Sequence, residues 1–180
     1  RHVPNQDAID WLLGEIMPLV WQKDDSIVFH LVGSDLPENL LALDDPRIVV
    51  HGWLPHLDNV FEQVRMTIAP LRFGAGLKGK VGDSLARGVP CVSTDIGAEG
   101  FGPVADVLHR AESASDLADL VVRSHGDHAD WDERSVRGVQ LIDEHFGYEA
   151  ARVAVTDLCE TLGVAAGSGR GRQSYRIGGN

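Results

Sequence analysis

Short apolar runs alternate with amphipathic stretches along most of the chain, and this alternation constrains the fold more than any other feature. Nearly continuous apolar runs at 26–33 (SIVFHLVG) and 66–69 (MTIA) predict buried parallel strands. Further strands are expected at 47–53, 90–94 and 104–110. Strands that alternate with helices over short connections predict an α/β doubly wound, Rossmann-like domain, with right-handed crossovers and helices on both faces of a parallel sheet.

The segments between these runs carry apolar residues at helical spacing. The longest early helix is expected at 7–21, with Asn5 as its N-cap, because apolar residues recur there at three- and four-residue steps. A helix at 80–87 should end at Gly88, since glycine is favoured just past a helix end. The other predicted helices cover 37–43, 57–64, the stretch from Ser113 or Ser115 to 122, and 130–163 with a break near Gly147.

A glycine loop follows the strand at 66–69 and leads into the helix at 80–87. Gly74 and Gly76 would let the backbone approach a ligand, and the helix start would direct free N–H groups at the same place. Lys78, Lys80 and Arg72 add positive charge suited to phosphate oxygens. The stretch therefore predicts an anion site, although a tight turn without a ligand is the alternative for any single Gly-x-Gly.

Other candidate ligand residues lie where strands end or one turn inside a helix. Asp83 could accept hydrogen bonds from sugar hydroxyls, or be an ordinary solvated carboxylate. Glu99 could bind a sugar hydroxyl or only cap a helix. Gly33, Gly52 and Trp53 follow strands at the edge where open α/β sheets bind ligands, with core packing as the alternative for Trp53.

The amino-acid composition limits the classes of partner and ligand that the chain is expected to bind. The 180 residues carry a net charge of −11, which argues against a nucleic-acid backbone as partner. Two cysteines form no disulfide framework, and eight histidines show no metal-ligand spacing, so we expect core thiols and no metal site. Without an apolar run of membrane-spanning length, we expect a cytoplasmic domain. The expected domain covers 1–163, followed by a Gly- and Ser-rich flexible tail at 164–180.

The run at 70–100, with G-x-G-x-K, a carboxylate followed by SLARG, then VPCVST and GAEG, resembles the donor-binding half of GT-B glycosyltransferases, the retaining enzymes called glycosyl transferases group 1. The family usually shows Glu-x7-Glu near the donor. Asp83 stands at the second Glu position and Ala75 at the first, which departs from the family pattern. By resemblance, Lys78 and Lys80 would face the diphosphate of the donor, and Gly52 and Trp53 would line the base pocket.

The resemblance implies transfer of a sugar from a nucleotide-diphosphate sugar, such as a UDP- or GDP-sugar, to an acceptor with retention of configuration and without a metal or other cofactor. Lys78 and Arg72 would act on the leaving diphosphate. It also implies that the chain begins one strand late in the doubly wound order, and that the acceptor-binding N-terminal domain lies outside it. This chain alone should then transfer no sugar, and any contact with a membrane would be made by other segments of the enzyme. The alternatives are half of a sugar-nucleotide epimerase and a regulatory or scaffolding α/β domain.

Overall fold

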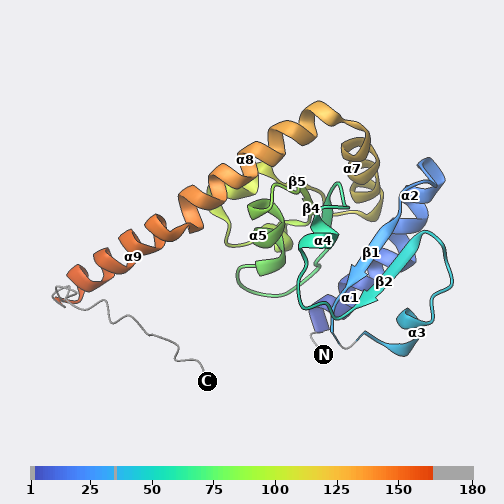
Figure 1. The fold of residues 1–180 in the computed structure, drawn as a ribbon, viewed down its shortest axis with the longest axis horizontal. Helices are drawn as coiled ribbons and strands as arrows, with labels where there is room; N and C mark the ends of the chain where they lie inside the picture. The colour runs from blue at the N-terminus through green and yellow to red at the C-terminus, as the bar shows by residue number, and fades with distance from the viewer. Residues whose placement is uncertain (1–2, 35, 164–180) are drawn as a thin grey trace, which may run out of the picture.

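The computed structural model describes residues 3–34 and 36–163, which form an α/β fold with helices on both sides of two parallel sheets (Figure 1). One sheet pairs β1 (Phe29–Val32) with β2 (Ile48–Gly52). The other orders β3 (Thr67–Ala69), β4 (Cys91–Ser93) and β5 (His109–Arg110) with β4 in the middle. All these pairings are parallel and their connections contain helices, so the predicted doubly wound class is confirmed.

The two sheets are not hydrogen-bonded to one another among the described residues. Within each sheet, β1 lies beside β2, and β4 lies between β3 and β5. The expectation that the chain begins one strand late in the doubly wound order stays a prediction.

The N-terminal helix is longer than predicted and contains a wide turn. It runs through α1 (Val3–Trp11), the π-helical turn η1 (Leu12–Ile16) and α2 (Met17–Lys23). Asn5 lies inside α1, so its predicted N-cap role was wrong. The wide turn immediately precedes Pro18, which has no N–H to donate to the preceding turn and whose ring crowds that turn.

Two apolar clusters hold the elements together. The first buries the predicted stripe of the N-terminal helix against β1 and α7 (Ala114–Gly126), with Ile16, Met17 and Val20 fully buried. The second packs α5 (Gly79–Ala86) against η2 (Gly102–Val107) and α8 (His128–Phe146), around the fully buried Phe101. The core therefore packs helices that are far apart in sequence against the strands.

The strand predicted at 104–110 is mostly a 3₁₀ helix. Pro103 lies in the first turn of η2 and favours a helical conformation there, and only His109 and Arg110 form β5. Val104 and Val107 are buried at a three-residue spacing, which suits a 3₁₀ turn. A short apolar run cannot by itself distinguish this turn from a strand.

Other helix boundaries follow the sequence signals. Ser113 caps α7 by accepting a hydrogen bond from the Asp116 N–H, and Gly88 adopts a φ of 70° after α5. The predicted break lies at Gly147, between α8 and α9 (Tyr148–Thr161), and α9 extends away from the body (Figure 1). The short helices are α3 (Glu38–Leu41), α4 (Asp58–Phe61) and α6 (Asp95–Ala98). The predicted tail at 164–180 lies outside the described residues.

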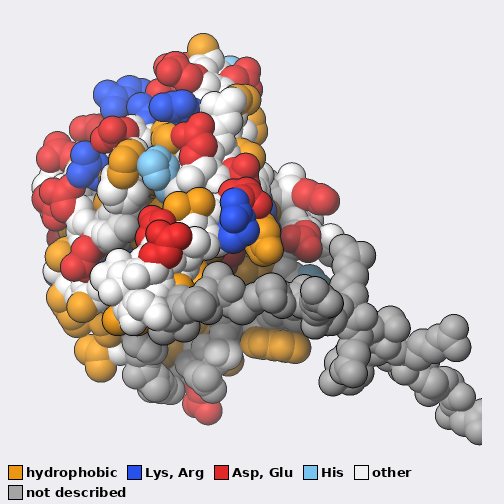
Figure 2. All heavy atoms as spheres, turned by 90° about the vertical axis from the view of Figure 1, so that its left-hand side faces the viewer, with side chains coloured by type: hydrophobic (Ala, Val, Ile, Leu, Met, Phe, Trp, Pro, Cys, Tyr) orange, Lys and Arg blue, Asp and Glu red, His pale blue; other side chains and the backbone are white. Residues whose placement is uncertain are grey.

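The surface carries charges of both signs. On the face drawn in Figure 2, acidic side chains are spread widely and lysines and arginines lie among them. Within residues 3–34 and 36–163, no helix is both long enough and apolar enough to cross a membrane.

Candidate functional site

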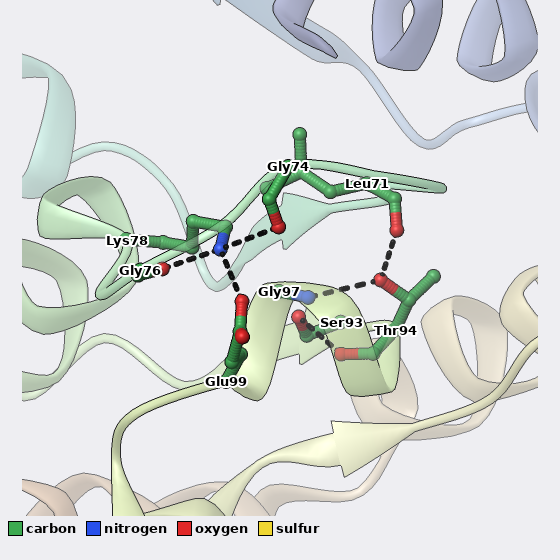
Figure 3. Close-up of polar contacts among 8 residues, drawn as sticks. All are labelled: Leu71, Gly74, Gly76, Lys78, Ser93, Thr94, Gly97 and Glu99. Carbon is green, nitrogen blue, oxygen red and sulfur yellow. Dashed lines mark hydrogen bonds and ion pairs between the residues drawn. The ribbon is translucent and has the colours of Figure 1, made fainter.

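The candidate site lies at the carboxyl ends of β3 and β4, where parallel strands of an α/β sheet present their following loops. The loop after β3 runs from Pro70 to Lys78, and the turn after β4 leads through Thr94 into α6. Figure 3 shows the two segments facing one another, with polar contacts between them. Residues far apart in sequence therefore meet at one edge.

Lys78 is the centre of this contact network. Its ammonium donates hydrogen bonds to the backbone oxygens of Gly74, at 3.3 Å, and Gly76, and it forms an ion pair with Glu99 Oε2 at 3.2 Å (Figure 3). Only 10% of the Lys78 side chain is exposed. Three donors thus meet three acceptors, and the ammonium group ties the glycine loop to the turn after α6.

Glu99 is the more exposed partner of this ion pair. About 48% of its side chain is exposed, and Glu99 is the residue at which α6 ends. It caps no following helix through its side chain, because η2 begins without a side-chain cap. Its carboxylate can therefore rotate into solvent, while the Lys78 ammonium remains held by two carbonyl oxygens.

Two buried hydroxyls hold the backbone of the site. Thr94 Oγ1 donates to the Leu71 carbonyl at 2.5 Å and accepts from the Gly97 N–H at 3.1 Å, so that it caps α6. Ser93 Oγ lies 3.3 Å from the Ala69 oxygen. Both side chains are almost completely buried. Because these bonds join β4 to the strand and loop beside it, they fix the position of the loop that contains the lysine.

Glycines are required here for conformation and for space. Gly74 and Gly76 have φ values of 124° and 82°, which L side chains rarely adopt. Gly97 lies so close to β3 and β4 that a Cβ there would come within 2.1 Å of Ser93 Oγ and 2.9 Å of the Ala69 oxygen. Ala75, between the two loop glycines, is exposed and presents only a methyl group at the position where the family pattern has Glu.

Lys80 lies beside the loop, in the first turn of α5. Its ammonium donates to Asn5 Oδ1 at 2.7 Å. Burial lowers the pKa of Lys80 below its ordinary value, and the neighbouring charge of Lys78 lowers it further. Because α5 begins next to both lysines, its N-terminal N–H groups and two cations share one small region, which favours an anion.

Arg72 is directed toward the N-terminal helix. Its guanidinium binds both carboxylate oxygens of Asp7, with Nε 2.9 Å from Oδ2, and lies over the Trp11 ring. The hydrogen bonds and charge of Arg72 lower the pKa of Asp7. Arg72 therefore attaches the loop to α1, separately from the lysine network.

Asp83 lies on α5 with 61% of its side chain exposed, and its nearest ionic partner is Arg87 at 3.5 Å, one turn along the helix.

Gly33 and Gly52 lie at the ends of β1 and β2, where the Gly33 N–H donates to the Gly52 oxygen at 2.9 Å. Trp53 follows with 68% of its residue surface exposed, which excludes core packing for this side chain.

A pair of histidines lies on β1 and β2, next to Gly52. His30 Nδ1 and His51 Nε2 are 3.0 Å apart, and the two rings are stacked. Burial lowers the pKa of His30, and the charge of His51 adds to this effect. The two ring nitrogens thus satisfy one another, between the neighbouring strands β1 and β2.

The structure therefore brings Gly74, Gly76, Lys78 and Glu99 into contact (Figure 3), with Ala75 and Lys80 beside them in sequence. It places Gly33, Gly52 and Trp53 at or just after the ends of β1 and β2, in the other sheet. Sequence reasoning missed Thr94, Ser93 and Asn5. Thr94 could have been found, because a Thr between a strand and a short helix is a recognised N-cap signal. Asn5 lies 75 residues from its partner Lys80, and no local pattern could have joined them.

Comparisons with known proteins identify the family of the chain. No curated protein matches the chain. The family model described as glycosyl transferases group 1 matches residues 1–127, which include both sheets and α7 and end just before α8. Since the match covers well over half of the sequence, the chain belongs to the glycosyl transferases group 1.

Proposed function

We propose that this domain binds the nucleotide-diphosphate sugar used by a retaining glycosyltransferase. The main support for the proposal is the Lys78 ammonium, which lies at the start of α5. Two loop carbonyls accept hydrogen bonds from it, and the exposed carboxylate of Glu99 is its third partner. Membership of the family supports glycosyl transfer in general. The positive charge and free helix N–H groups support a phosphate-containing donor.

Phosphate would bind by replacing Glu99 as the third partner of Lys78. The two carbonyl contacts keep the ammonium in place, so a phosphate oxygen would meet a preorganised donor. Lys80 and the first N–H groups of α5 would add to the same positive field. Negative charge that develops on the diphosphate as its bond to the sugar breaks would then be stabilised without reorganisation of the loop.

The carboxylates would bind the uncharged parts of the donor. Released from Lys78, Glu99 becomes free to accept hydrogen bonds from sugar hydroxyls. Asp83 is exposed on α5, one turn from the phosphate position, and could bind the ribose. Gly52 and Trp53 would line the base pocket with Gly33, and the large exposed surface of Trp53 is available for stacking. Arg72 would act on the diphosphate indirectly, because its contact with Asp7 attaches the glycine loop to α1.

The acceptor would be bound by another domain of the same enzyme. Helix α9 extends from the body (Figure 1), and its exposed apolar residues Val153, Val155 and Leu158 give it a surface that a neighbouring domain could cover. Under this proposal the chain binds its donor weakly by itself and transfers no sugar.

A thermal-shift screen tests the proposal. The purified chain is melted with UDP, GDP, ADP and their sugar conjugates, together with Lys78→Met and a matched control, Lys23→Met. Lys23 forms an exposed ion pair with Asp119 far from the loop, so its replacement removes the same charge at a remote place. A ligand that binds only the folded chain raises its melting temperature.

We expect the nucleotides of one base to raise the melting temperatures of the wild type and the Lys23 variant equally. The melting temperature of the Lys78 variant should not change. Equal stabilisation of all three proteins would place the nucleotide elsewhere. The absence of any response, with all proteins folded, would favour a regulatory or scaffolding domain whose lysine only supports its loop.

A further inference from the structure

The N-terminal half of α1 contacts two of the cations beside the glycine loop. Asn5 Oδ1 accepts a hydrogen bond from the Lys80 ammonium at 2.7 Å. Two residues further along the helix, the Asp7 carboxylate accepts hydrogen bonds from the Arg72 guanidinium. The same helix therefore supplies an uncharged partner to one cation and a charged partner to the other.

The three cations of the candidate site differ in the charge of their partners. Arg72 and Lys78 each form an ion pair with a carboxylate. Lys80 forms no ion pair within residues 3–34 and 36–163, and its partner there is the amide of Asn5. An amide oxygen accepts a hydrogen bond but has no net charge. Of these three cations, Lys80 is therefore the one whose positive charge the protein compensates least.

The Lys80 ammonium also retains donors for a ligand. A lysine ammonium has three N–H donors. Lys78 directs its donors at two carbonyl oxygens and Glu99, whereas Lys80, in the described part of the chain, donates only to Asn5. Because Lys80 is exposed to solvent, phosphate oxygens can approach its two other N–H groups.

Backbone donors lie at the same place as this ammonium. The first hydrogen bond of α5 runs from the Val81 N–H to the Lys78 oxygen at 2.8 Å. The N–H groups of Gly79 and Lys80 therefore precede the helical bonding pattern. A lysine side chain is long and flexible, so its direction decides whether the ammonium adds to these N–H groups or turns into solvent.

We propose that Asn5 is a positioning residue for the phosphates of the donor. It holds the Lys80 ammonium beside the start of α5 and leaves the charge of that ammonium uncompensated. This role rests on the proposed function, and Asn5 acts through Lys80 rather than by touching the ligand. A carboxylate at position 5 would also hold the lysine but would compensate its charge, and a methyl group would not hold it.

Calorimetric titration of the full chain tests this role. The proteins are the wild type, Asn5→Asp, Asn5→Ala, Lys80→Met and the double variant with Asn5→Asp and Lys80→Met. UDP, GDP, ADP and their nucleosides are the probes, and the ratio of diphosphate affinity to nucleoside affinity is measured for each protein. Gln22→Glu is the matched control, because it adds the same charge at an exposed residue of α2, at the other end of the N-terminal helix.

We expect the wild type and Gln22→Glu to give the same ratio. Asn5→Asp should lower the ratio about fivefold, and should have no further effect once Lys80 is replaced. Its melting temperature should equal or exceed that of the wild type, because an ion pair takes the place of the hydrogen bond. Asn5→Ala should lower the ratio less, since Lys80 keeps its charge and loses only its fixed direction. A purely structural role would reverse this order, and would weaken the binding of nucleoside and diphosphate alike.

Two results would overturn the role of Asn5 while leaving the proposed function intact. One is an unchanged ratio in Asn5→Asp when Lys78→Met lowers it. The other is an equally large effect of Asn5→Asp in the chain that already has Lys80→Met. If no diphosphate binds the wild type more tightly than its nucleoside, the proposed function is wrong, and the role of Asn5 is wrong with it.

Discussion

At the scale of single residues, the site depends on a few polar side chains that hold backbone segments at fixed distances. Lys78 donates hydrogen bonds to two loop carbonyls, and Thr94 connects the same loop to α6. These residues are therefore structural in the absence of ligand, and the proposed binding role uses an arrangement that folding has already formed. Glu99 differs from them, because its exposed carboxylate can leave without exposing a buried group.

Thr94→Val tests the structural part of this description. The substitution keeps the shape but leaves the Leu71 carbonyl and the Gly97 N–H without their buried partner, which should cost about 1–3 kcal/mol of unfolding free energy. Urea denaturation measures the loss. Thr94→Ser keeps the hydroxyl and should cost less than Thr94→Val; a larger loss for the serine variant would mean that packing of the methyl group matters more than the two hydrogen bonds.

At the scale of elements, much of the fold was predictable because its signals are local. The apolar runs predicted the strands, Ser113 and Gly88 marked helix ends, and the Gly74–Lys78 loop marked the connection from β3 to α5. Predictions failed where two local structures share one pattern, as at 104–110, or where a partner distant in sequence decides the conformation. The Lys80–Asn5 and Arg72–Asp7 contacts are of that second kind, because only the tertiary fold places α1 beside the loop.

Helix α9 should contribute little to the stability of the domain. None of its residues is buried, and among the described elements it packs mainly on α8. A chain truncated after Gly147 should therefore melt within about 3 °C of the full chain, as followed by circular dichroism. A second truncation after Gly126 also removes α8, which supplies the buried Leu141 to the core, and should abolish cooperative unfolding. A large loss from the first truncation would show that α9 is part of the core.

At the scale of the whole molecule, the stability of the folded chain should fall in mild acid. Burial lowers the pKa of His30 and of His109 in the folded chain, whereas in the unfolded chain both titrate near an ordinary value of about 6.5. The unfolded state therefore binds more protons below that pH, and folding loses free energy as the pH falls from about 6.5 toward the folded pKa values.

Melting temperatures at pH 7.5 and pH 5.5 check this dependence. The wild type should melt lower at pH 5.5, and His30→Gln should show a smaller difference between the two pH values because one of the responsible groups is gone. His56→Gln, at an exposed histidine, serves as the control. If His30→Gln retains the full difference, His30 does not contribute to the acid sensitivity.

The central claim for the whole molecule is that its glycine loop binds the diphosphate of a nucleotide sugar through Lys78. The most direct measurement is calorimetric titration of the wild type and Lys78→Met with the best nucleoside diphosphate and with the same nucleoside without phosphates. We expect the wild type to bind the diphosphate at least about tenfold more tightly than the nucleoside, or about 1.4 kcal/mol, and Lys78→Met to lose most of this difference. If the variant keeps the whole difference, Lys78 does not bind the phosphates, and the account of the site is wrong.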